Sequence, residues 1–164
     1  MRKITLLILL LLECAIVQSR NQIISIKRAK HYHNQALKDF KKGNDSIAYY
    51  DLVKSISILE SNQKNDKSLY AECLHDAGII ALKGLNDFDL FSKYLKRAIE
   101  VKQEIYGKST DYYWSIECYA DGLVHYSDYV GFPKGIVYLE EAINLYEKTP
   151  SYEKNDSYRK ALND

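Results

Sequence analysis

The sequence repeats itself with a period of about 44 residues, and this period limits the possible folds more than any other feature. The octapeptide YLKRAIEV, which begins at Tyr94, matches YLEEAINL, which begins 44 residues later at Tyr138, at five of eight positions when Leu and Val are treated as equivalent. A related octapeptide, DLVKSISI, begins at Asp51, which is 43 residues before Tyr94. A period in the forties is typical of stacked helical hairpins, because one hairpin cannot bury its apolar face alone. The period therefore predicts a helical solenoid.

Apolar residues recur at helical spacing between clear stop signals, and only seven glycines and two prolines interrupt the pattern. The segment 41–44 would end a helix with two lysines and a glycine, Gly107 would end another, and Pro133 suits a first helical turn, where its missing N–H has no partner. We therefore expect an all-α domain. Its helices span residues up to about 42, then about 46–61, 67–83, 87–106, 110–128 and 133–148.

The predicted helices group into hairpin repeats within one domain, residues 20–164. The tripeptide KND at 64–66 returns at 154–156, so a further helix is expected to begin there. The repeats span about 27–62, 67–107, 110–149 and, in part, 154–164.

Small residues recur at the same period. Gly78 and Gly122 are 44 residues apart. We expect them to face Ala98 and Ala142, since small residues on facing helices let the two backbones approach closely.

Residues 1–19 have the pattern of a secretory signal peptide. The segment starts with the cations Arg2 and Lys3, continues with an apolar run over 4–12 and reaches a small residue at Ser19. The apolar run is nine residues long, which is shorter than the roughly 20 that a membrane-spanning helix needs. We predict cleavage near Ser19 and an exported protein, periplasmic or secreted, with no membrane span in the mature chain. An uncleaved anchor and lipidation at Cys14 are the alternatives.

The charge balance argues against nucleic acid as a partner. Loss of residues 1–19 removes two cations and one anion, so the formal net charge changes from +1 to 0. Phosphate binding calls for a clustered basic excess. The one basic cluster, Lys27, Arg28 and Lys30, is short and is expected to face solvent.

No pattern of metal ligands or catalytic residues occurs in the sequence. Cys73 and Cys118 are expected to be small buried hydrophobic residues, although a disulfide between them stays open. His31 and His33 are two residues apart and would point in different directions around a helix. We therefore predict no metal and no cofactor.

Two histidine and aspartate pairs could be interpreted as acid–base pairs. His75 lies beside Asp76, and His125 is four residues from Asp121, on the same helical face. No nucleophile completes either pair, so we expect structural histidines and no enzymatic activity.

The segment LHDAGIIALKGLNDFDLFSKYLKRAIEVKQEIYG, residues 74–107, resembles the longer, kinesin-light-chain-like variety of tetratricopeptide repeat. The resemblance covers about residues 27–164 and is strongest over 67–148. It implies a right-handed α-solenoid of antiparallel helix hairpins. The residues at the packing positions of this pattern are Leu74, Ala77, Gly78, Leu95 and Ala98.

The resemblance also implies a concave groove, lined by the first helix of each repeat, that binds a peptide or a partner protein. The alternative is that the groove positions face solvent or pack against a fourth repeat. These positions are Glu72, His75, Ile79 and Leu82 in one repeat and Ile116, Tyr119, Leu123 and Tyr126 in the next.

Two functions are compatible with this sequence. In the first, the chain is an exported scaffold for protein–protein interaction. In the second, it is the N-terminal sensory or regulatory region of a larger signalling protein whose output domain lies beyond residue 164. Self-association through an uncapped C-terminal face is a third, less supported interpretation.

Overall fold

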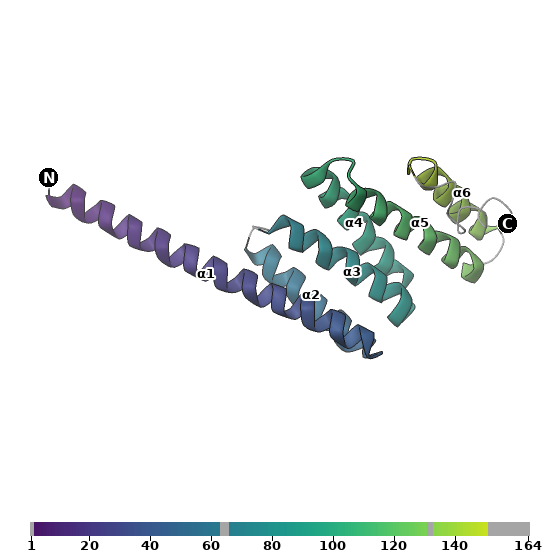
Figure 1. Cartoon of the computed structure of the whole chain (residues 1–164), viewed down its shortest axis with the longest axis horizontal. Coiled ribbons are helices and arrows are strands. Elements are labelled where there is room, and N and C mark those ends of the chain that lie inside the picture. Colours follow the sequence, from purple (N-terminus) through teal and green to yellow (C-terminus); the bar gives the residue numbers. More distant parts are fainter. Residues whose placement is uncertain (1, 63–65, 131–132, 151–164) are drawn as a thin grey trace.

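The computed structural model describes residues 2–62, 66–130 and 133–150, and these residues form α-helices joined by short turns (Figure 1). No strand occurs within these ranges, which confirms the all-α prediction for them. The predicted partial helix over 154–164 lies outside the described residues. The helices are α1 (Arg2–Lys41), α2 (Asp45–Ser61), α3 (Lys67–Leu85), α4 (Phe88–Tyr106), α5 (Thr110–Val130) and α6 (Lys134–Tyr146).

Local side-chain chemistry sets the helix boundaries. The side chains of Asp66 and Asp87 precede α3 and α4, and each accepts a hydrogen bond of 2.9 Å from a backbone N–H in the first turn. Such N-caps satisfy donors that have no partner within the helix. Asn86 (φ 53°) and Gly107 (φ 61°) adopt left-handed conformations just after α3 and α4. The predicted boundaries are therefore close to the observed ones, although α3 continues to Leu85.

Each helix packs chiefly against its neighbours in sequence. The closest pairs are α1 with α2, α3 with α4 and α5 with α6, and contacts between α2 and α3 and between α4 and α5 join these pairs. Figure 1 shows α2 turning back along α1, and α4 turning back along α3. By contrast, α3 has few contacts with either α1 or α5.

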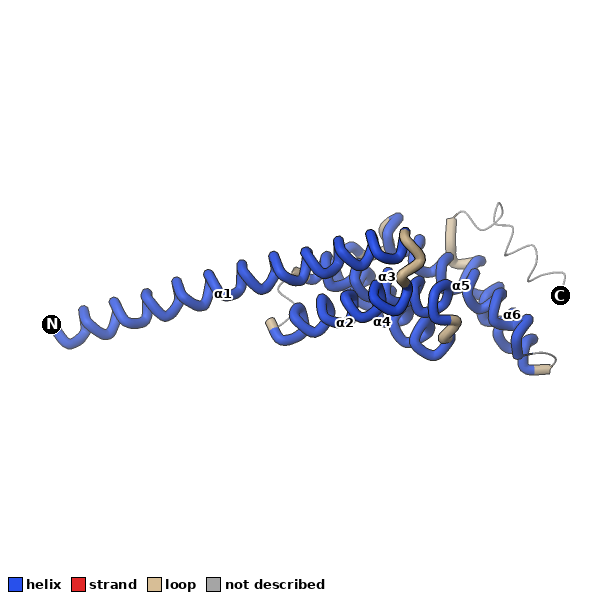
Figure 2. The backbone as a smooth tube through the Cα atoms, turned by 90° about the horizontal axis from the view of Figure 1, so that it is seen from below, coloured by secondary structure: helices blue, strands red, loops and turns tan. Residues whose placement is uncertain are grey.

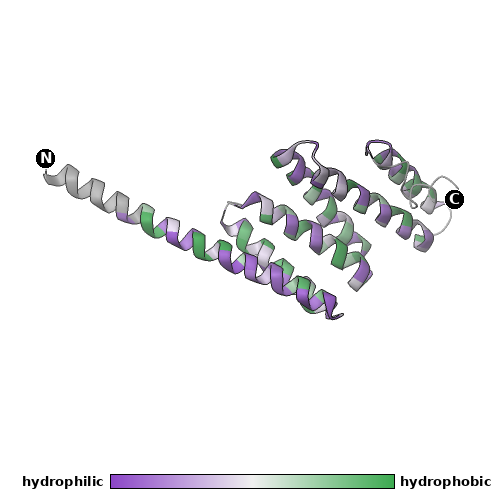
Figure 3. Cartoon of the chain, viewed as in Figure 1, coloured by the Kyte–Doolittle hydropathy of each residue, from purple (hydrophilic) through white to green (hydrophobic). Residues whose placement is uncertain are grey.

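Two hydrophobic clusters form the core, and the middle pair of helices contributes to both. The first cluster extends from Ala29 on α1 to Val101 on α4, and the second extends from Ala81 on α3 to Tyr146 on α6. Hydrophobic and hydrophilic residues alternate around the packed helices (Figure 3), which is the pattern of helices with one buried face. The α3–α4 pair is therefore covered on both sides.

The first half of α1 extends beyond the packed helices (Figure 2). The predicted signal segment is continuous with the rest of this helix, and Ile16, Val17, Ile23 and Ile24 are each more than half exposed. Within the described ranges, no helix combines the length and the apolar character that a membrane crossing requires. Cleavage near Ser19 stays a prediction.

The two glycines at equivalent positions pack differently. A Cβ atom on Gly78 would overlap the side chain of Leu95 on α4, and a Cβ atom on Gly122 would overlap the ring of Phe91, also on α4. The atoms nearest the two glycines therefore belong to Leu95 and Phe91 rather than to the expected Ala98 and Ala142. At Gly122 the reason is the bulk of Phe91, whose ring occupies the space that the absent side chain of Gly122 leaves open.

A methyl group at position 122 tests this contact. We expect Gly122→Ala to lower the free energy of unfolding by about 1–3 kcal/mol, because the added carbon overpacks the core against Phe91. Phe91→Leu makes room for the methyl group, so the double variant should lose less stability than the sum of the two single variants. Urea denaturation at neutral pH measures all three values, and strict additivity would contradict the contact.

Candidate partner-binding groove

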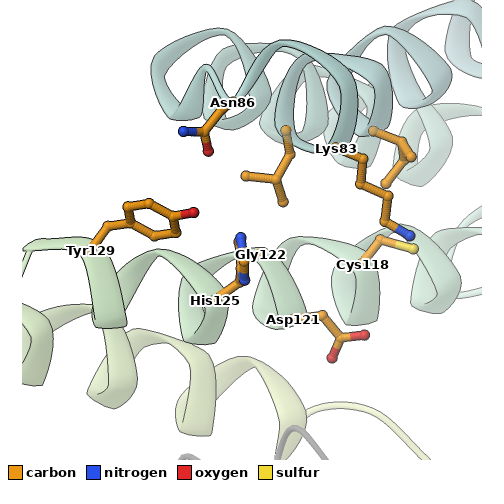
Figure 4. A pocket seen from close by; sticks show the side chains of 9 residues that line it. Lys83, Asn86, Cys118, Asp121, Gly122, His125 and Tyr129 are labelled. Atoms are coloured by element: carbon orange, nitrogen blue, oxygen red, sulfur yellow. The ribbon is translucent and has the colours of Figure 1, made fainter. Parts of the chain in front are cut away.

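A cleft of about 610 Å³ lies between α3 and α5, and we call it the α3–α5 groove (Figure 4). It exists because these two helices make few contacts with each other, whereas each packs closely on α4. Its lining residues are Ile79, Leu82 and Lys83 on α3, Asn86 just after α3, and Cys118, Asp121, Gly122, His125 and Tyr129 on α5.

The spacing of the lining residues places them on one face of each helix. On α5, Cys118, Gly122, His125 and Tyr129 follow one another at intervals of three or four residues, which brings them onto one stripe. Trp114 lies one turn before Cys118 on the same stripe and is 57% exposed. The stripe of α5 that faces α3 therefore begins and ends with an exposed aromatic ring.

The groove combines an apolar wall with polar groups at its two ends. Ile79 and Leu82 supply aliphatic side chains. Lys83 extends toward Cys118 at one end, whereas Asn86 and Tyr129 lie at the other (Figure 4). Burial raises the pKa of the Cys118 thiol to about 11, so the thiol is uncharged at neutral pH.

Of the eight residues predicted to line a groove, only Ile79 and Leu82 do so in the α3–α5 groove. Glu72 is exposed but is not part of the lining.

Four predicted groove residues are buried, and their side chains are part of the packing between helices: His75, Ile116, Tyr119 and Leu123. Tyr126 is partly buried, and its ring stacks on that of Phe88 with a centroid distance of 3.7 Å. Tyr119, Leu123 and Tyr126 lie on the side of α5 that packs against α4 and α6, whereas α5 presents a different side to α3.

Tyr119 illustrates the difference between its predicted and its observed position. Its ring stacks on Phe91 at a centroid distance of 5.5 Å, and its hydroxyl lies 3.1 Å from the Ser92 hydroxyl. Substitution of Tyr119 would therefore change stability and would not be a clean test of binding.

A buried polar cluster adjoins the groove, and we call it the Ser115 hub: Ser115 on α5, His75 on α3 and Lys102 on α4. Lys102 Nζ donates a hydrogen bond of 2.8 Å to Ser115 Oγ, and Ser115 Oγ lies 2.9 Å from His75 Nδ1. With the imidazole proton on Nε2 the Ser115 hydroxyl donates to Nδ1, and with the proton on Nδ1 it accepts from both partners. One hydroxyl group thus connects three helices.

The hub keeps His75 neutral. Burial, and then the positive charge of Lys102, lower the pKa of His75 to about 4, although Asp76 acts in the opposite direction. Burial also lowers the pKa of Lys102. Asp76 itself is 2.7 Å from His33 Nε2, and this contact joins α1 to α3.

Sequence reasoning missed Ser115 and Lys102. The hydroxyl is separated from its two partners by 13 and 40 residues, so no short motif reveals the hub. One signal existed: Lys102 continues the buried stripe of Leu95 and Ala98 at helical spacing, where an apolar residue is usual. Ser115 is 0% exposed, so the contact between its hydroxyl group and the Lys102 amine joins helices in this structure.

The remaining predicted chemical groups are placed as follows. Cys73 and Cys118 are both free thiols, and Cys73 is buried with its sulfur 3.2 Å from Ser55 Oγ. His125 packs its ring against Tyr129 with a centroid distance of 5.4 Å. In the part of the chain that the structure describes, no group of three or more potential ligands could hold a metal ion.

Comparison of the chain with protein-family models, with curated proteins and with solved structures gives no match. The resemblance to tetratricopeptide repeats therefore stays a prediction, and the function has to be argued from the geometry of the groove and the hub.

The protonation of His75 makes stability depend on pH. The pKa is near 6.5 in the unfolded chain and about 4 in the folded chain, so the unfolded chain takes up the proton first as the pH falls. The contribution of neutral His75 is complete above about pH 6.5 and is lost as the pH falls toward 4, with a total on the order of 3 kcal/mol.

Urea denaturation across this pH range measures the effect as a difference between the wild type and His75→Gln, which cannot take up the proton. His31→Gln is the matched control, because His31 is exposed on α1. We expect His75→Gln to lose much of the acid dependence and His31→Gln to keep it. Parallel stability curves for the wild type and His75→Gln would contradict this assignment.

Proposed function

We propose that this chain is an exported repeat protein of the tetratricopeptide type that binds a peptide segment of a partner protein in the α3–α5 groove and has no catalytic activity. In this proposal the three helix pairs form successive hairpins of a right-handed α-solenoid. The helices α1, α3 and α5 line its concave side.

The packing of the helices supports the solenoid. Each pair contacts the next through its second helix, and the two core clusters overlap at α3 and α4. Such nearest-neighbour packing is the general property of repeat folds. Repeat folds commonly present extended concave surfaces to partners, which is why the groove is the proposed binding site.

The observation that carries the proposal is the lining of the α3–α5 groove. A cleft of about 610 Å³ lies within the size range of ligand sites. It is small compared with the surface that a whole globular partner would cover. Ile79 and Leu82 can receive an apolar side chain, and Asn86, Lys83 and Tyr129 can hydrogen-bond to groups on either side of it. A short peptide segment with one apolar residue between polar groups has this chemistry.

Tyr129 tests the binding site because it lines the groove and is 62% exposed. Peptides selected from a displayed library on the wild-type protein should bind Tyr129→Ala about tenfold more weakly or worse, since interface tyrosines often contribute 1–2 kcal/mol or more. Fluorescence polarisation with labelled peptides measures the dissociation constants.

Tyr50→Ala is the matched control. Tyr50 lies on α2, outside the groove, and is 61% exposed, so the two variants remove equally accessible rings. Equal affinities of the two variants for every selected peptide would contradict the proposed site.

The proposed export of the chain leads to a separate prediction. Mass spectrometry of the chain recovered from the extracytoplasmic fraction of the producing cells should find an N-terminus near Arg20, because cleavage near Ser19 removes the apolar segment. A chain that retains Met1 and stays in the cytoplasm would contradict export without affecting the proposed groove.

A further inference from the structure

We propose that the Ser115 hub is an acid-sensitive latch that joins α3 to α5 beside one end of the α3–α5 groove, and that a proton on His75 weakens it. The inference rests on the proposed function only for the role of the groove as a binding site. The latch itself is a property of the folded chain and can be measured without a partner.

The position of the hub carries the first step. His75 precedes the groove residue Ile79 by four residues on α3, and Ser115 precedes the groove residue Cys118 by three residues on α5. The hydrogen bond between them therefore lies about one helical turn from the groove. Because α3 and α5 make few direct contacts with each other, this buried hydrogen bond is one of the few interactions that join the two helices directly.

The closeness of two cationic groups to one buried hydroxyl carries the second step. At neutral pH the Ser115 hydroxyl accepts from Lys102 Nζ at 2.8 Å and lies 2.9 Å from Nδ1 of His75. A proton taken up by His75 places the hydroxyl between two cations in a buried site where charges are poorly screened. The repulsion between these two cations weakens the contacts that join them through Ser115.

The surrounding charges decide how strongly the proton is opposed. Lys102 on α4 opposes it, whereas Asp76, beside His75 on α3, favours it. Burial opposes the charged form of Lys102 most strongly, whereas Asp111 on α5 and then Asp76 and Glu72 on α3 favour it. From α1, His33 contacts Asp76 at 2.7 Å. A proton on His75 adds a second positive charge where α3 and α5 meet, so acid should loosen this junction.

The thiol of Cys118 reports on the latch, because it lines the groove next to the hub and is partly buried. The experiment labels the folded chain with a thiol reagent at pH 7.5 and at pH 4.5 and locates the label by peptide mass spectrometry. Each rate is divided by the rate for the urea-unfolded chain at the same pH, which removes the intrinsic pH dependence of thiol chemistry. We expect the normalised Cys118 rate to rise about tenfold or more at the lower pH, which corresponds to a latch weakened by about 1.4 kcal/mol.

Two variants should abolish this rise by different routes. His75→Gln keeps a hydrogen-bonding side chain but cannot take up the proton, and Lys102→Met removes the second cation, so that Ser115 can accept from protonated His75. Lys96→Met is the matched control on α4, because Lys96 is exposed, and it should behave like the wild type. If one of the first two variants does not fold, the other still gives the test.

Three outcomes would overturn the latch. One is a Cys118 rate that does not change between the two pH values. Another is a rise of the same size in the wild type and in the folded His75→Gln or Lys102→Met variant. The third is labelling of the buried Cys73 together with Cys118, since this would show that the whole domain opens. A failure of the Tyr129 peptide test would count against the proposed function and would leave the latch unaffected.

Discussion

The structure depends on one constraint, which is that a pair of helices cannot cover its own apolar surface. Each helix therefore buries one side against its partner in the pair and another side against the next pair, and α3 and α4 contribute to both core clusters. The helices α3 and α5 both pack on α4 and touch each other little. The α3–α5 groove follows from this arrangement, because the space between the two helices is not filled by either of them.

The helices and their order could be predicted from the sequence, because the signals for them are local. Apolar periodicity, the cationic segment 41–44, Gly107 and Pro133 place most boundaries within a few residues of those observed. The groove could be predicted only in part. Ile79 and Leu82 line the cleft between α3 and α5, whereas the predicted residues of α5 lie on another side of that helix, because the repeat suggested that α5 packs as α3 does. The ring of Phe91 against Gly122 breaks that equivalence, and a single sequence does not reveal which helix such a ring contacts.

The Ser115 hub could not be predicted, because it joins residues from three helices that are far apart in the sequence. It nevertheless gives the α3–α5 junction a property that apolar packing lacks. Apolar contacts respond little to pH, whereas one proton on a buried imidazole places a second positive charge near an ammonium group. The two helices that line the groove, α3 and α5, are also the helices that His75 and Ser115 of the hub join.

The packing of α5 against α4, beside the α3–α5 groove, is tested most directly by proton–proton distances in solution. A NOESY spectrum of the isotope-labelled protein at neutral pH should contain cross-peaks between the Phe91 ring and the Gly122 Hα protons, and between the His75 ring and the Ser115 Hβ protons. These cross-peaks are expected because both pairs are in contact across helix junctions. Assigned resonances without either cross-peak would contradict the stacking of the helices and the groove that results from it.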